Sequence, residues 1–159
     1  MSFIKKQTVG IWVTFVTMIL AIVSFIIYNV NINSAGYFQH AASPVAVRYM
    51  IIAAVLWIAA IVIAEIPVQG IADKIMTLLA DAARIAAPAL CIAAAITLIS
   101  SRVEGFAFIY FSNEEVLQEV QTAANMSSSH GAIASIAALF VTAIVGMAAA
   151  FFSVKRKEA

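Results

Sequence analysis

The stretch QTVGIWVTFVTMILAIVSFIIY, from Gln7 to Tyr28, contains no charged residue. At a rise of 1.5 Å per residue, about 20 apolar residues cross roughly 30 Å of hydrocarbon as an α-helix. Two lysines precede the stretch, as in a signal peptide, but it is longer than the roughly 7–15 apolar residues of a signal sequence. We therefore predict a retained transmembrane helix at residues 8–28, with cleavage near Ser34–Ala35 as the alternative.

Three further segments have the length and composition of transmembrane helices, at about residues 45–66, 82–100 and 131–154. The chain of 159 residues is 64% hydrophobic and 11% charged, whereas soluble domains have about 25% charged residues. The mean hydropathy of +1.04 is likewise too high for a surface in water. The sequence predicts an all-α, polytopic membrane protein, a single four-transmembrane-helix bundle over residues 1–159.

The distribution of lysine and arginine predicts the orientation, because cytoplasmic loops carry an excess of both. If the N-terminus is inside, two basic residues face outward, Arg48 and Arg102. Seven then face inward: Lys5, Lys6, Lys74, Arg84, Lys155, Arg156 and Lys157. We expect a multi-pass protein of the plasma membrane with both termini in the cytoplasm.

Two outer segments follow from this topology, residues 29–44 and residues 101–130. The second is acidic, and its Ser112–Glu115 sequence, SNEE, matches a capping box that begins a helix. We predict a short amphipathic helix there, lying on the outer surface or over the mouth of the bundle. The candidate interaction residues of this segment are Phe106, Tyr110, Glu115 and Glu119.

The inner connection, residues 67–81, has apolar residues at helical spacing. It predicts a short amphipathic helix, separate from the third span or continuous with it.

Small residues recur along the predicted spans, and in lipid such residues let helices approach closely. In the fourth span they are Ala134, Ala138, Thr142, Gly146 and Ala150, and in the third Ala83, Ala87, Cys91 and Ala95. The first span has Gly10, Thr14, Thr17, Ala21 and Ser24. We interpret all three stripes as helix-packing faces.

Ionisable residues near the inner ends of the spans are candidates for transport or gating, because charge inside a bilayer is costly and often functional. Asp81 and Arg84 are three apart and can pair on one helical face. Pro88 lacks an N–H, which leaves the Arg84 carbonyl without its helical partner and favours a kink. Glu65 ends the second span and could pair with Lys74 or Arg84.

Other chemistry has little support in the sequence. The single cysteine, Cys91, excludes an internal disulfide, and His40 and His130 lack metal-ligand spacing. No phosphate-binding or catalytic motif is present, so no cofactor, metal site or catalytic residue is predicted. The net charge of +1 predicts no nucleic-acid partner.

The leading functional hypothesis is a non-enzymatic membrane subunit or scaffold. Its partners would be the lipid bilayer and a membrane or extracytoplasmic protein, or a second copy of itself. The alternative is a small transporter or channel component that uses the charged, proline-containing inner end of the third span. A membrane enzyme is a third possibility, with only the outer histidines and glutamates as acid–base candidates.

Overall fold

The computed structural model describes residues 8–154, and all regular secondary structure in this part of the chain is helical. Its helices are α1 (Val9–Asn33), α2 (Pro44–Glu65), α3 (Ile71–Phe111), α4 (Glu114–Val120) and α5 (Ala123–Ala150). All but α4 are long and apolar enough to cross a membrane, which suggests membrane residence. Five of the seven basic residues assigned to the inner face, residues 5, 6 and 155–157, lie outside the described residues.

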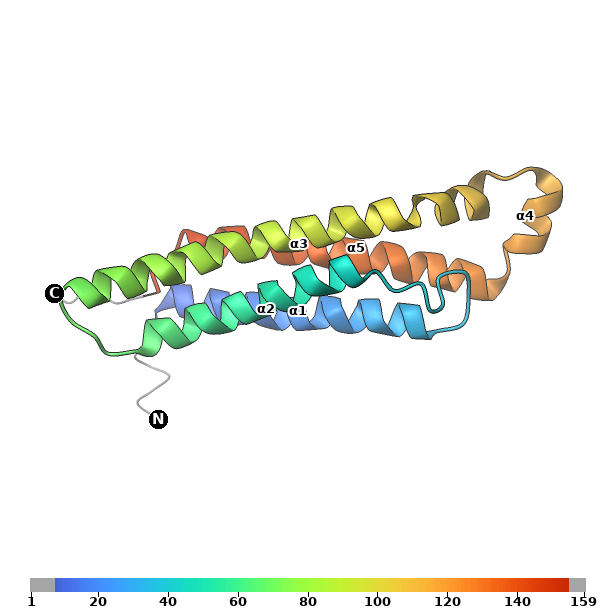
Figure 1. Cartoon of the computed structure of the whole chain (residues 1–159). Coiled ribbons are helices and arrows are strands. Elements are labelled where there is room, and N and C mark those ends of the chain that lie inside the picture. Colours follow the sequence, from blue (N-terminus) through green and yellow to red (C-terminus); the bar gives the residue numbers. More distant parts are fainter. Residues whose placement is uncertain (1–7, 155–159) are drawn as a thin grey trace, which may run out of the picture.

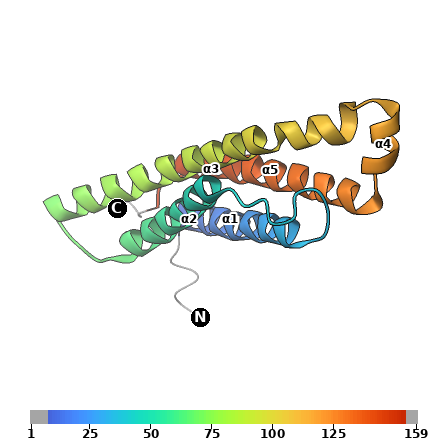
Figure 2. The ribbon, with the colours of Figure 1, turned by 45° about the vertical axis from the view of Figure 1, so that its right-hand side comes forward.

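The four long helices form an elongated bundle in which successive long helices run antiparallel (Figures 1 and 2). α3 packs against α2 and α5, and α1 packs against α5 and α2. Following the predicted orientation, we call the end that holds Glu65 and Ile71 the inner end and the end that holds α4 the outer end. Both views show the first turns of α3 extending past the other helices at the inner end.

The buried residues of the long helices alternate between spacings of four and three. In α1 they are Gly10, Thr14, Thr17, Ala21, Ser24, Tyr28 and Asn31, and in α2 Ala46, Met50, Ala53, Trp57 and Ala60. A mean spacing of 3.5 residues keeps one face toward its neighbours when helices cross at about +20° in a left-handed bundle. The predicted stripes of the first and third spans lie on these buried faces.

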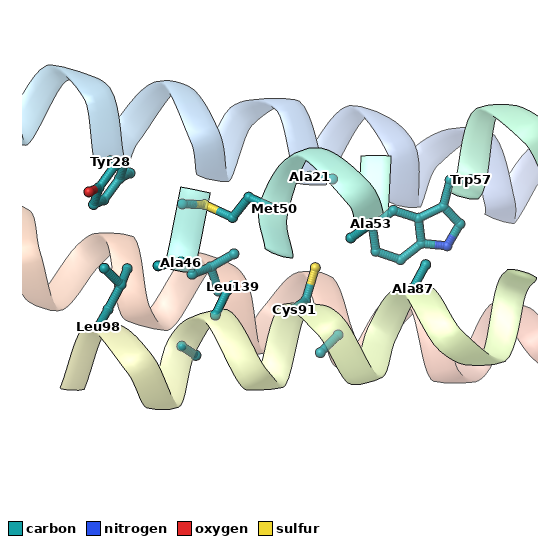
Figure 3. Packing of buried hydrophobic residues seen from close by; sticks show 13 residues of the cluster. Ala21, Tyr28, Ala46, Met50, Ala53, Trp57, Ala87, Cys91, Leu98 and Leu139 are labelled. Atoms are coloured by element: carbon teal, nitrogen blue, oxygen red, sulfur yellow. The ribbon is translucent and has the colours of Figure 1, made fainter. Parts of the chain in front are cut away.

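Small side chains fill most of the core (Figure 3). Ala46, Ala53 and Ala87 are fully buried, and they surround a few large side chains such as Trp57 and Tyr28. The Trp57 indole N–H has no hydrogen-bond partner among the described residues. Because alanine leaves the helix backbones close together, dispersion contacts between backbones contribute much of the packing.

The predicted spans correspond to the four long helices, and the helices that contain the third and fourth spans extend well beyond them. The third span was predicted at residues 82–100, and α3 extends over Ile71–Phe111. The helix predicted in the inner connection is thus continuous with the third span, which was one of the two alternatives, and α3 also includes residues 101–111 of the predicted outer segment. The fourth was predicted to begin at residue 131, whereas α5 begins at Ala123. Hydropathy detects only the part of a helix that suits hydrocarbon, and a helix continues wherever its backbone hydrogen bonds are satisfied. Most of the predicted outer segment 101–130 is therefore helical.

The stripe predicted for the fourth span only partly coincides with the buried face of α5. Thr142 and Gly146 are buried, but Ala138 and Ala150 are partly exposed and Ala134 is exposed. A strict spacing of four advances about 40° per step around a helix of 3.6 residues per turn, so the stripe leaves the buried face. The buried face is made by Ser128, Ala132, Ser135, Leu139, Thr142, Gly146 and Ala149.

The short outer helix exists, but its predicted cap was off by one residue. Asn113 is the N-cap of α4, and its side-chain oxygen accepts a hydrogen bond from the Val116 N–H at 3.0 Å. The Ser112 hydroxyl instead donates to the Phe108 carbonyl at 2.8 Å, at the end of α3. α4 stops at Val120, and α5 begins at Ala123.

Candidate functional site

Arg84 is the most constrained charged residue in the described part of the chain. Its side chain is 1% exposed and donates hydrogen bonds to three helices or helix ends. Nε donates to the Thr14 hydroxyl of α1 at 3.1 Å, and Nη1 pairs with the Asp81 carboxylate at 3.3 Å. Nη2 donates to the carbonyls of Ala149 and Phe152, the latter at 2.8 Å. Arg84 thus joins α1 and α3 to the end of α5.

The positive charge of Arg84 lies at the C-terminal end of α5, where the helix dipole is negative. The last carbonyls of a helix lack intrahelical partners and carry the negative end of the helix dipole. One nitrogen of the guanidinium binds the Ala149 carbonyl in the last turn of α5 and the Phe152 carbonyl just after it, which places positive charge at the favourable end of the helix. Thr14 is itself oriented by a 2.7 Å hydrogen bond from its hydroxyl to the Gly10 carbonyl. These contacts describe a structural clamp.

The C-terminal segment after α5 is also fastened to the start of α1. The Thr8 hydroxyl donates to the Val154 carbonyl at 3.0 Å. A Cβ at Gly10 would meet the backbone carbonyl of Ser153, so glycine is required for this close approach. The Arg84 clamp and the contact between the start of α1 and the segment after α5 both lie at the inner end of the bundle.

The candidate transport residues do not form one site. Glu65 is exposed at the end of α2 and is not among the partners of Arg84. Pro88 is buried in the middle of the bundle next to Gly146, and α3 continues through it as one helix. Of the four candidates, Asp81 and Arg84 form an ion pair.

A second buried arginine, Arg102, lies at the outer end. Its side chain is 5% exposed, it donates to the Ala41 carbonyl, and its guanidinium carbon lies 4.8 Å from the centre of the Phe38 ring. These contacts fasten the α1–α2 connection to α3 through a hydrogen bond and a cation–π interaction. Sequence reasoning treated Arg102 only as an outer charge, because its partners are about sixty residues away along the chain.

Above Arg102, the outer end forms a small aromatic cap. Its core consists of Phe38, Ile109 and Ala132, with Phe106, Tyr110 and Met126 packed around it. The rings of Phe38 and Phe106 lie 5.4 Å apart edge to face, and the Ser129 hydroxyl donates to the Tyr110 hydroxyl at 3.0 Å. The predicted interaction residues Phe106 and Tyr110 are thus partly buried and help to hold the cap together.

The exposed aromatic surface of the cap is made by other residues than those predicted. Phe111 is 84% exposed, and Tyr37 and Phe108 are each 42% exposed. The Tyr37 and Phe108 rings lie 5.8 Å apart, tilted by 37°. The sequence predicted Phe106 and Tyr110 as the contact residues of this segment, but the helical register of α3 turns Phe108 and Phe111 outward instead.

α4 closes the cap and carries the predicted acidic residues. None of its seven residues is buried, and Glu115 and Glu119 are both exposed. Two amide side chains fix the helix from outside: Gln121 Nε2 donates to the Ile109 carbonyl at 3.0 Å and Asn125 Nδ2 to the Val120 carbonyl at 2.8 Å. The glutamates therefore lie on a defined helix without being needed for its attachment.

A shallow groove of about 250 Å³ lies between α1 and α5 near the outer end, with Ile26, Ile27 and Val30 in its wall. Its central polar group is Asn31. With the amide oriented to satisfy both atoms, its nitrogen donates to the Ser128 carbonyl at 2.9 Å and its oxygen accepts from the Ala132 N–H at 3.1 Å. Gly131 leaves the room for this amide. Asn31 is thus already bonded within the bundle.

The two histidines, His40 and His130, are exposed and lie on different segments. Within residues 8–154, no group of three or more His, Cys, Asp or Glu side chains is close enough to hold a metal ion. Cys91 is buried on the core face of α3, among the small residues that pack there.

Comparisons of this chain with protein-family models, with curated proteins and with solved structures gave no significant match.

Proposed function

We propose that this chain is a non-enzymatic, four-span subunit or scaffold of the plasma membrane that binds a protein partner through its outer cap. The observation that carries the proposal is the use of its buried charges. Arg84 and Arg102 each bind backbone carbonyls of other segments, so their charge holds the bundle together. A transport pathway would need such groups around a solvated cavity, and this arrangement favours a scaffold over the transporter alternative.

The exposed charges support a placement in the bilayer. On α2, Arg48 and Glu65 are exposed at opposite ends, about 26 Å apart along the helix. On α3, the Asp81 side chain is 48% exposed and Glu104 is exposed, about 35 Å away. Between these limits the outward faces are apolar, and their lengths suit a hydrocarbon layer of roughly 30 Å.

The proposed orientation puts both termini in the cytoplasm. In a Cys91→Ala background, a cysteine at Lys157 should stay unlabelled by an impermeant maleimide on intact cells and react after lysis, because basic residues are retained inside. A cysteine at Glu119, on exposed α4, should show the opposite pattern. Rapid labelling at position 157 in intact cells would reject this orientation.

The outer cap is the favoured partner surface because it combines exposed aromatic rings with an acidic helix. Aromatic residues are enriched in protein interfaces, and the acidic face matches a basic protein patch better than an anionic lipid surface. Glu115 and Glu119 project from a helix in which no residue is buried, so they are available to such a patch. Other outer segments lack this combination.

Replacing Glu115 and Glu119 with Lys should therefore weaken recovery of the partner at least several-fold in co-purification from membranes at matched expression. The fold should persist, because Gln121 and Asn125, which attach α4, are unchanged. The matched control compares Glu119→Lys with Glu104→Lys, an equal charge change on α3 below the cap. Equal recovery of all variants at low and high salt would exclude α4 as an electrostatic contact.

A further inference from the structure

α3 is too long for the bilayer to cover its whole outward face. Its 41 residues extend about 61 Å, whereas a bilayer measures about 40–45 Å even with its headgroups. Fitting the helix inside would require a tilt of about 42°, beyond the observed range of about 0–40°. The other long helices have 25, 22 and 28 residues and need no such tilt.

The excess lies largely at the inner end. Asp81 marks the inner limit of the proposed hydrocarbon layer, so the preceding ten residues of α3 extend about 15 Å beyond it. Figures 1 and 2 show this inner extension, residues 71–80, projecting past the other helices. One side of it faces the bundle, where Ala80 is fully buried.

The other side of the inner extension is apolar and open. Ile71 is 79% exposed, Leu78 70%, Ile75 53% and Leu79 51%. Exposed apolar surfaces of this kind mark sites of contact with a protein or with a membrane. Lipid accounts for exposed isoleucines within the hydrocarbon layer, but it does not account for Ile71 and Ile75 beyond Asp81.

This open side continues along α3 as one apolar seam. Its members alternate between spacings of four and three: Ile71, Ile75, Leu78, Ala82, Ile85, Ala89, Ile92, Ile96, Ile99 and Val103. All are exposed except Ile92, which is partly buried. The seam lies opposite the core face, since Ala87 follows Ile85 by two residues, about 200° around the helix. Its repeat of 3.5 residues is that of a left-handed coiled coil, and it crosses the limit at Asp81 without interruption.

We propose that the α3 seam docks onto the α3 seam of a second copy of this chain, as a parallel two-stranded coiled coil that begins in the inner extension. A bilayer gives all copies the same orientation, so a two-fold axis along the membrane normal brings each seam position against itself. Self-pairing tolerates no charge on the seam, and none is present; Lys74 and Asp81 flank it. Ala82 and Ala89 on the seam allow the two helices to approach closely.

Disulfide cross-linking in membranes tests the register. In a Cys91→Ala background, cysteines at Ile75 and Leu78 should form covalent dimers under mild oxidation, because seam positions meet across the two-fold axis. Thr77→Cys in the same extension, but on its bundle-facing side, should cross-link at least several-fold less. A cysteine at Glu119 on the outer helix controls for random collision. Equal cross-linking at all four positions, or cross-links to a protein of different size, would overturn the proposal.

A charge on the seam tests the energetics. Ile75→Glu lies outside the hydrocarbon, so it should not hinder insertion, but it places two carboxylates against each other and should shift the mass in nanodiscs from dimer to monomer. Gln69→Glu, exposed in the loop before α3, adds the same charge off the seam and should leave the dimer intact.

The inference rests on the proposed membrane placement, but it does not depend on the outer partner. Recovery of the chain in carbonate-washed membranes distinguishes a failure of the membrane placement from a failure of the dimer. A chain that is retained in membranes but is monomeric without substitution would overturn only the dimer, whereas a chain released by the wash would overturn both.

Discussion

Arg84→Met should lower the midpoint of thermal unfolding by about 6–12 °C. The substitution keeps an unbranched side chain but removes every hydrogen bond that joins Thr14 and the Ala149 and Phe152 carbonyls to α3. Removing one partner of a buried charged cluster typically costs about 3–5 kcal/mol. We expect about 3 kcal/mol, because Asp81 is 48% exposed and regains water, and each kcal/mol corresponds to roughly 2–4 °C at this chain length.

The single cysteine provides the readout for this measurement. Cys91 is 1% exposed in the core, so a fluorogenic maleimide reacts with it only after the bundle opens. Arg84→Lys should fall between wild type and Arg84→Met, since one ammonium retains the charge but cannot span all the acceptors. Arg48→Met, at an exposed arginine of α2, is the control and should shift the midpoint little. Equal midpoints for Arg48→Met and Arg84→Met would contradict the clamp.

The four candidate transport residues, Glu65, Asp81, Arg84 and Pro88, show how much of such a site a single sequence can predict. The pairing of Asp81 with Arg84 was predictable because it is local, three residues apart on one helix. The remaining bonds of Arg84 were not, because Thr14 and Ala149 come from segments about 65–70 residues away. Sequence spacing therefore identified an unusual arginine, and only the packing of α1 and α5 showed which segments it joins.

The helix count was predictable for a different reason than the helix ends. Each long helix has a continuous apolar stretch, which hydropathy detects directly. The ends are set by capping and by tertiary contacts, such as Thr122, whose side chain caps α5 through the Asn125 N–H. Polar residues near that cap, such as Ser128 and Ser129, are buried in the bundle and lowered the local hydropathy without ending the helix.

The packing stripes give a similar lesson. In α1, the predicted residues alternate between four and three and lie on the buried face, because that alternation follows the helix. In α5, alanines are so frequent that a strict spacing of four could be traced onto the surface as far as Ala134. A strict spacing of four stays on the packing face over a short run, as in α3 from Ala83 to Ala95, but it drifts off that face over the longer run of α5.

Gly146 is a position in the middle of the bundle where one added side chain should have a large effect. A Cβ there would lie 2.9 Å from Pro88 Cγ, 2.9 Å from Trp57 Cζ2 and 3.2 Å from Thr17 Cγ2, so it meets three other helices at once. The proline ring is rigid and Trp57 is fully buried, so neither can move without disturbing the core. At Gly146, α5 therefore approaches all three other long helices closely.

Gly146→Leu should separate these helices. It should either prevent the bundle from folding or lower its unfolding midpoint by more than Gly146→Ala does. Gly146→Ala should be milder, because overpacking by one methyl group costs about 1–3 kcal/mol while alanine regains up to about 1 kcal/mol of helix propensity. Ala148→Leu lies at the same depth of α5 on an exposed face, and Ala134→Leu adds the same bulk on the predicted stripe. Both should retain near-wild-type protection of Cys91 from the maleimide. A stable, protected Gly146→Leu variant would mean that α5 does not approach Pro88 and Trp57, whereas a collapse of Ala134→Leu equal to that of Gly146→Leu would restore the strict four-residue stripe as the packing face.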